Sequence, residues 1–177
     1  MAEYPIPLFE LNTLDQADFT RVLEPLFEGP PWIVERAWLE RPFDTREVLY
    51  QAVCTIMYAA SLDEQLALLR AHPDLVGRAA LAGTLSGAST GEQSAAGLDR
   101  LTPDDIALFT RENAAYRATF GFPFIICARE HTKSSILTAF AERLPHTREQ
   151  EMETALAEVA KICALRLRDL VRQEGEE

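Results

Sequence analysis

The chain has 177 residues, and its 28 acidic and 17 basic side chains give a formal net charge of -11. A chain of this length, with 47% hydrophobic residues, is expected to form a single domain over residues 1–177. The negative charge argues against nucleic acid as a partner, and the absence of an apolar run of ~20 residues argues against a membrane span.

Helix starts are the most frequent pattern along the chain. Each is a Ser, Thr or Asp followed three residues later by Glu or Gln. In such a capping box, the side chain of each residue accepts a hydrogen bond from the backbone amide of the other. The pairs are Asp44/Glu47, Ser61/Glu64, Ser89/Glu92 and Thr147/Gln150, and Thr102 precedes a proline and two acidic residues. In chain order, these starts and the apolar spacing predict helices over residues 14–27, 45–60, 62–70, 90–100, 103–119, 133–143 and 148–173.

Residues 122–128, with the sequence FPFIICA, are the one strand-like run. The run has no second run to pair with, and its proline cannot donate to a central ladder position. We therefore expect an extended, buried connector. The predicted fold class is all-α, a single-domain helical bundle of about seven to nine helices with no sheet.

Cysteines and targeting signals indicate the compartment. Cys54, Cys127 and Cys163 are far apart and lie among apolar neighbours, which favours reduced core residues and a reducing environment. Neither end of the chain resembles a targeting signal, so a cytoplasmic location is expected. The three histidines show no metal-ligand spacing, and nucleotide-binding motifs are absent, so no metal or cofactor is expected.

Arg166 is the first candidate functional residue. On a helical wheel of the last predicted helix it falls in the middle of the apolar face, among Val159, Ile162 and Cys163. A buried arginine needs an anionic or carbonyl partner, because an unpaired charge in a core is too costly to persist. The partner is either a structural Glu or Asp, or the carboxylate of a substrate.

His72 is the second candidate, since the proline that follows it restrains its backbone and fixes the direction of its imidazole. A histidine can titrate near neutrality and act as an acid or base, although a histidine beside a turn can equally be a structural hydrogen-bonding residue.

Glu92 is the third candidate. It forms a capping box with Ser89 on one interpretation. On the other, Gly91 leaves the backbone amides of a first helical turn open to an anionic, oxygen-rich ligand.

Four motifs together resemble one family. They are HPDL at residues 72–75, STGEQSAAGL at 89–98, FGFPFIICAR at 120–129 and the end of the last helix around Arg166. The chain is similar, over almost its whole length, to the 2-oxo-4-hydroxy-4-carboxy-5-ureidoimidazoline (OHCU) decarboxylases. The resemblance implies an all-helical, usually dimeric, cofactor-free enzyme of urate (purine) catabolism that converts this small-molecule ureidoimidazoline to (S)-allantoin.

The resemblance also implies roles for individual residues. The catalytic residues would be His72, as proton donor, with Glu92 and Arg166. Substrate contacts would come from the residue after the histidine, from the turn containing the glutamate and from the connector, that is from Pro73, Ser89, Thr90, Gly91, Glu92, Gln93, Phe124, Ile125, Ile126, Cys127 and Ala128.

Two other functions are compatible with the residues. In a non-catalytic helical dimerisation or binding module, the three candidate residues would all be structural. A metal-dependent ureide hydrolase would lose activity on chelation, but the sequence supplies no ligand cluster for it.

Overall fold

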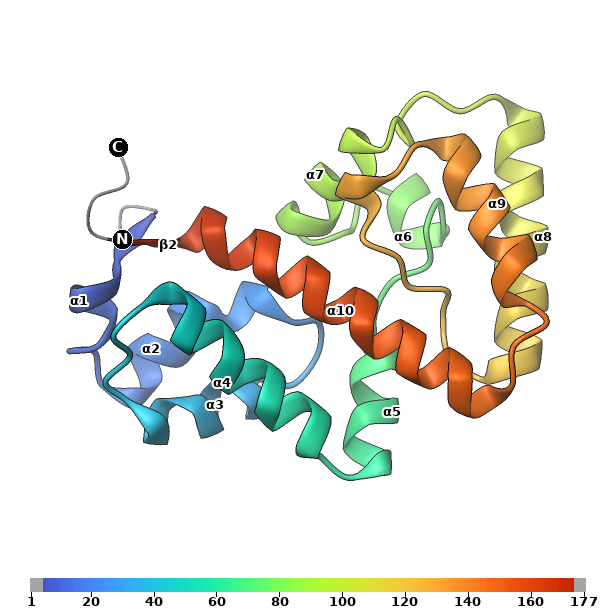
Figure 1. Ribbon diagram of the computed structural model, residues 1–177. Coiled ribbons are helices and arrows are strands. Elements are labelled where there is room, and N and C mark those ends of the chain that lie inside the picture. Colours follow the sequence, from blue (N-terminus) through green and yellow to red (C-terminus); the bar gives the residue numbers. More distant parts are fainter. Residues whose placement is uncertain (1–4, 174–177) are drawn as a thin grey trace. The chain divides into compact units, whose positions relative to one another are not determined.

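The computed structural model describes residues 5–173 (Figure 1). The contacts of these residues divide them into two compact units, one of residues 5–68 with residues 160–173 and one of Leu69–Val159. Both units are built mainly from helices, which confirms the predicted all-α class.

The first unit contains the N-terminal helices and the end of the last helix. Its elements are β1 (Ile6–Pro7), α1 (Leu8–Leu11), α2 (Gln16–Leu23), η1 (Glu24–Leu26), α3 (Trp32–Ala37), η2 (Trp38–Glu40), α4 (Arg46–Ala59), most of α5 (Leu62–Ala71), the end of α10 (Arg148–Leu170) and β2 (Val171–Arg172). The parallel pairing of β1 with β2 is a two-residue exception to the prediction of no sheet. It also explains why α10 ends at Leu170 and not at residue 173.

Helix α4 shows why the first unit folds as it does. Its apolar side chains recur at the three-and-four spacing of one helical face, and Leu49, Val53 and Met57 on that face are fully buried. Helix α3 packs against α4 and α2. The predicted helix over residues 14–27 is broken after Leu23, where Pro25 lies in the short 3₁₀ turn η1.

The second unit contains α6 (Arg78–Leu81), α7 (Gly87–Ala95), α8 (Pro103–Phe120), η3 (Ala128–Glu130), α9 (Lys133–Arg143), the end of α5 and the start of α10. Helices α8 and α9 lie side by side (Figure 1). Between them and the connector is an aromatic cluster, in which Phe124 stacks on Phe140 with ring centroids 3.8 Å apart and Tyr116 meets Phe124 edge-on at 5.2 Å.

The segment before η3 matches its prediction as an unpaired connector. Residues 122–127 belong to no strand, and the residues from Phe122 to Ala128 are all buried. We call residues 122–128 the connector. Because it is buried without a ladder, its peptide groups must find side-chain or local partners.

The helix starts agree with the predicted caps at three places. Ser61 with Glu64, Thr102 with Asp105 and Thr147 with Gln150 form the expected hydrogen bonds. Two other caps were predicted at the wrong residue. Helix α4 is capped by Thr45 and not by Asp44, and α7 is capped by Ser86 and not by Ser89.

Three short helices, α1, α3 and α6, were not predicted, because four to six residues are too few to show a helical period. The cysteines are buried, as expected, and burial raises the pKa of the Cys163 thiol well above its ordinary value. Within residues 5–173 no single helix is long and apolar enough to cross a bilayer, although α4 and α5, which meet at a bend of 114°, pass the same test together.

Candidate functional site

His72 lies immediately after α5, at the start of a tight loop in the second unit. Its side chain is 6% exposed, and its backbone amide donates to the Leu69 carbonyl. The loop that follows is held from two helices. The carboxamide of Asn113 on α8 donates to the Leu75 carbonyl at 2.8 Å, and the Gln93 side chain on α7 accepts from the Val76 amide at 3.0 Å. These bonds fix the backbone of the loop three and four residues after His72.

The same loop contains a strained residue. Val76 has a φ of 54°, in the left-handed region that β-branched residues rarely adopt. Gly77, which follows, has no room for a side chain, because a Cβ atom there would lie 2.7 Å from the Cβ of Asp74. Strain of this kind persists only where the surroundings over-determine the backbone. The bonds from Gln93 and Asn113 provide that constraint.

Helix α7 begins earlier than predicted, and this changes the interpretation of Glu92. Ser86 accepts from the Ser89 amide, so Ser89 and Glu92 lie inside the helix and do not form a capping box. Gly91 likewise lies beyond the first turn of α7. The prediction that Gly91 leaves the backbone amides of a first helical turn open to a ligand was therefore wrong.

Two faces of α7 are distinguished by burial. Ser89 and Gln93, four residues apart, are buried on one face, whereas Thr90 and Gly91 are exposed and Glu92 is half-buried. The Thr90 hydroxyl donates back to the Ser86 carbonyl, and the Gln93 oxygen is occupied by Val76. Helix α7 also packs against η3, at the end of the connector (Figure 1).

The connector is held by two buried charged side chains. Arg143, the last residue of α9, donates to the Ile125 carbonyl at 2.7 Å. Glu158 on α10 accepts from the Cys127 amide at 2.7 Å. The Cys127 amide, expected among the substrate-binding groups, therefore has a protein partner in this structure.

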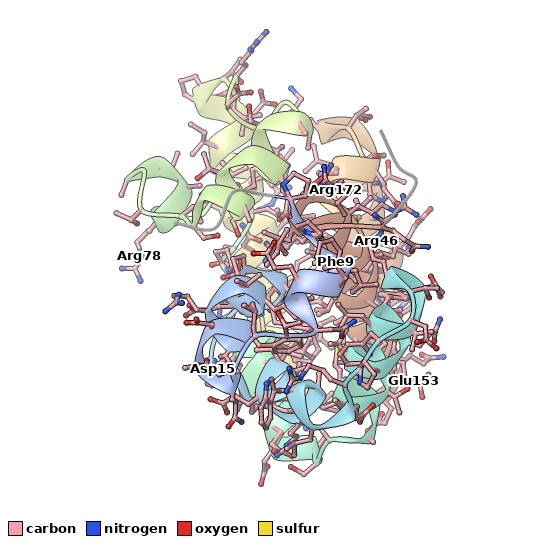
Figure 2. All side chains as sticks on the ribbon, turned by 90° about the vertical axis from the view of Figure 1, so that its left-hand side faces the viewer. Phe9, Asp15, Arg46, Arg78, Glu153 and Arg172 are labelled. Atoms are coloured by element: carbon pink, nitrogen blue, oxygen red, sulfur yellow. The ribbon has the colours of Figure 1, made fainter. Side chains whose placement is uncertain are left out.

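A pocket of about 510 Å³ opens beside the loop after His72. It is lined by Pro73, Asp74, Gly77, Arg78, Ala82, Thr84 and Arg117. Asp74 and Arg117 form an ion pair at 2.8 Å, and the exposed side chain of Arg78 points outward (Figure 2). Of the predicted site residues, Pro73 belongs to this lining.

Arg166 lies in the first unit and is 5% exposed, as the helical wheel predicted. Its guanidinium donates to the Pro25 carbonyl at 3.0 Å and to the carboxylate of Glu28 at 3.1 Å. Glu28 is thus an acidic partner of the kind that the structural interpretation requires.

The predicted site residues fall into two groups. His72, Pro73, residues 89–93 and residues 124–128 all belong to the second unit, where Gln93 and η3 connect the loop, α7 and the connector. Arg166 belongs to the first unit. Sequence reasoning missed Arg143 and Glu158, although both lie on largely apolar helical faces, the same signal that identified Arg166.

The family suggested by the motifs is matched independently. The sequence profile described as OHCU decarboxylase matches residues 12–168. A 2-oxo-4-hydroxy-4-carboxy-5-ureidoimidazoline decarboxylase of Halalkalicoccus jeotgali is 40% identical over 161 residues, which cover 91% of this chain and 89% of the relative.

Two solved structures are also similar. An (S)-allantoin synthase has a TM-score of 0.73 and 30% identity, and the match covers 92% of this chain and 53% of that one. An OHCU decarboxylase determined in the presence of (S)-allantoin has a TM-score of 0.64 and 25% identity, covering 77% of this chain and 87% of that one. The profile and the H. jeotgali relative each span most of the sequence, and the chain therefore belongs to the OHCU decarboxylase family.

Proposed function

We propose that this protein decarboxylates 2-oxo-4-hydroxy-4-carboxy-5-ureidoimidazoline to (S)-allantoin, which makes it a carboxy-lyase of urate catabolism. Membership of the family carries the proposal. The arrangement of the second unit supports it, because the loop after His72, α7 and the connector are tied to one another through Gln93 and η3.

The reaction requires few chemical contributions from the protein. The carbon that loses CO2 carries a hydroxyl and adjoins a ring C=N, so the electron pair of the breaking C–C bond can move into the ring. The hydroxyl-bearing carbon then becomes the ring carbonyl, and a proton must be delivered from one side to the neighbouring carbon of the former C=N bond, which carries the ureido group, to give a single enantiomer. Orientation, charge placement and one directed proton are therefore the contributions required of the side chains, and no metal or cofactor is needed.

Each candidate residue has a role in this proposal. His72 delivers the proton, and its buried, constrained loop suits a directed transfer. Glu92 positions the substrate hydroxyl, and Arg166 holds an anionic or carbonyl group of the substrate. Pro73, Ser89 through Gln93 and Phe124 through Ala128 provide the remaining contacts. Ser86, and not Ser89, caps α7, so the carboxylate of Glu92 is not needed for a capping box. This supports the role proposed for Glu92.

We also propose a homodimer in the cytoplasm that acts on a small molecule without a nucleic-acid or membrane partner. The dimer rests on the resemblance to the family, whereas the acidic net charge argues against nucleic acid and the buried thiols favour a reducing compartment. Light scattering of the purified protein tests the dimer, and a mass equal to one chain would contradict it.

The decisive experiment generates the substrate in situ from urate and follows circular dichroism. Uncatalysed decay gives racemic allantoin, so accelerated appearance of one enantiomer supports the proposed function. Decay at the uncatalysed rate, with racemic product, would contradict it and would favour the non-catalytic module.

A further inference from the structure

Arg143 and Glu151 form a buried charged cluster in the second unit that the proposed chemistry does not use. Their side chains are 8% and 0% exposed. One carboxylate oxygen of Glu151 accepts from Arg143 Nε at 2.7 Å, from Arg143 Nη2 and from the Tyr116 hydroxyl. Its other oxygen lies 2.8 Å from His146 Nδ1. Burial and the bond to Glu151 raise the pKa of Tyr116, which keeps this hydroxyl a donor.

The stability of the fold alone gives little reason for this cluster. A buried ion pair loses about as much in desolvation as it gains in attraction, and well-packed apolar residues can often replace it. The surrounding aromatic rings could fill the space, since Phe124 already lies under the Arg143 guanidinium at 4.3 Å. What apolar residues could not supply is a donor for the Ile125 carbonyl, which accepts from Arg143 Nη1 at 2.7 Å.

The connector has a second charged anchor two residues further on. The Cys127 amide donates to Glu158 at 2.7 Å, and Glu158 is 8% exposed. Charge-assisted hydrogen bonds are short and directional, so two of them, on either side of Ile126, fix the peptide groups between them. The end of the connector continues into η3, which packs against α7.

We propose that Arg143 is a positioning residue of the substrate site, which sets the backbone of the connector through its bond to the Ile125 carbonyl. Glu151 holds the Arg143 guanidinium in place, and Glu158 anchors the connector at the Cys127 amide. This inference rests on the proposed function, because it requires that the connector contacts the substrate. An arginine is required because its planar fork can meet Glu151 and Ile125 at once, whereas the single ammonium of a lysine cannot.

The test is Arg143→Lys, which keeps the buried positive charge opposite Glu151 but loses the bond to Ile125. We expect KM to rise about tenfold or more with a smaller change in kcat, and the affinity for (S)-allantoin to fall by a similar factor. The reason is that a connector without the bond to Arg143 loses about one positioned hydrogen bond to the ligand. Hydrogen–deuterium exchange of residues 122–128 should become faster.

The matched control is Tyr116→Phe, which removes one donor to Glu151 but leaves Arg143 on Ile125. We expect a lower melting temperature with unchanged KM and unchanged exchange in the connector. If Arg143→Lys keeps the wild-type KM and the wild-type exchange of the connector, or if both variants raise KM equally, the positioning role is wrong.

Two further comparisons keep the test decisive. If Arg143→Lys does not fold, Glu158→Ala removes the other anchor of the connector, which lies on α10, and it should raise KM and speed exchange of residues 122–128 in the same way. A normal KM in that variant would overturn the proposal. If the wild-type protein fails to accelerate the decarboxylation, the proposed function is wrong, while the exchange of residues 122–128 still decides whether Arg143 fixes the connector.

Discussion

Replacing His72 with asparagine separates proton delivery from structural support. Asparagine keeps a polar side chain of similar reach but cannot act as an acid near neutral pH. Positioned acid–base groups typically contribute about 10²–10⁴-fold in rate, which corresponds to about 2.7–5.4 kcal/mol in activation free energy. We therefore expect kcat to fall by that factor with little change in KM, since the other proposed substrate contacts remain.

The structure also bounds the effect of this variant on folding. His72 is 6% exposed, but its loop is held by backbone bonds to Gln93 and Asn113 that asparagine leaves in place. We expect the free energy of unfolding to fall by about 1 kcal/mol, within the ordinary range for a single substitution and well below the 5–15 kcal/mol of a typical domain.

The assay for His72→Asn is circular dichroism with substrate generated from urate, together with thermal unfolding. Residual product should drift towards racemic allantoin, because CO2 can still leave while protonation is undirected. A variant with wild-type kcat, or one that loses only stability, would show that His72 is a structural turn residue and that the proton comes from elsewhere.

Three further predictions test neighbouring features. Glu92→Gln should leave the melting temperature nearly unchanged, because Glu92 caps no helix, while kcat falls by about 10²-fold or more, and normal turnover would end its proposed role. Gly77→Ala should destabilise the fold by about 1–3 kcal/mol and lower kcat, because its Cβ would lie 2.7 Å from Asp74 Cβ, and thermal unfolding with steady-state kinetics measures both. Exhaustive chelation should leave turnover intact, and a loss reversed by added zinc would favour a metal-dependent enzyme.

Local patterns predicted the helices well where they are long. The helices over residues 133–143 and 103–119 agree with α9 and α8 to within one residue, because caps and apolar spacing act over neighbouring residues. The start of α7 was less predictable, since both Ser86 and Ser89 can cap a helix. The earlier start places Ser89 and Gln93 on the buried face, and this gain in packing lies outside any local pattern.

The sequence motifs indicated candidate site residues one by one, but they did not indicate the side chains that hold those residues in place. The motifs identified His72, Glu92 and the connector, yet the bonds that hold them join residues far apart in sequence, such as Arg143 with Ile125 or Asn113 with Leu75. A helical wheel shows that a charged residue faces the core. It carries no information about which distant carbonyl or carboxylate meets that charge.

Arg166 illustrates this limit of the wheel, and its two interpretations predict different kinetics. Its partner Glu28 satisfies the structural interpretation. If Arg166 also holds the substrate, Arg166→Lys should lower kcat/KM by about 10²-fold, because lysine lacks the planar fork, while Glu28→Gln keeps the arginine and should mainly lower the melting temperature. If Arg166 is only structural, both variants should lose stability and keep the wild-type kcat/KM of the folded protein, and the substrate would then need another cation.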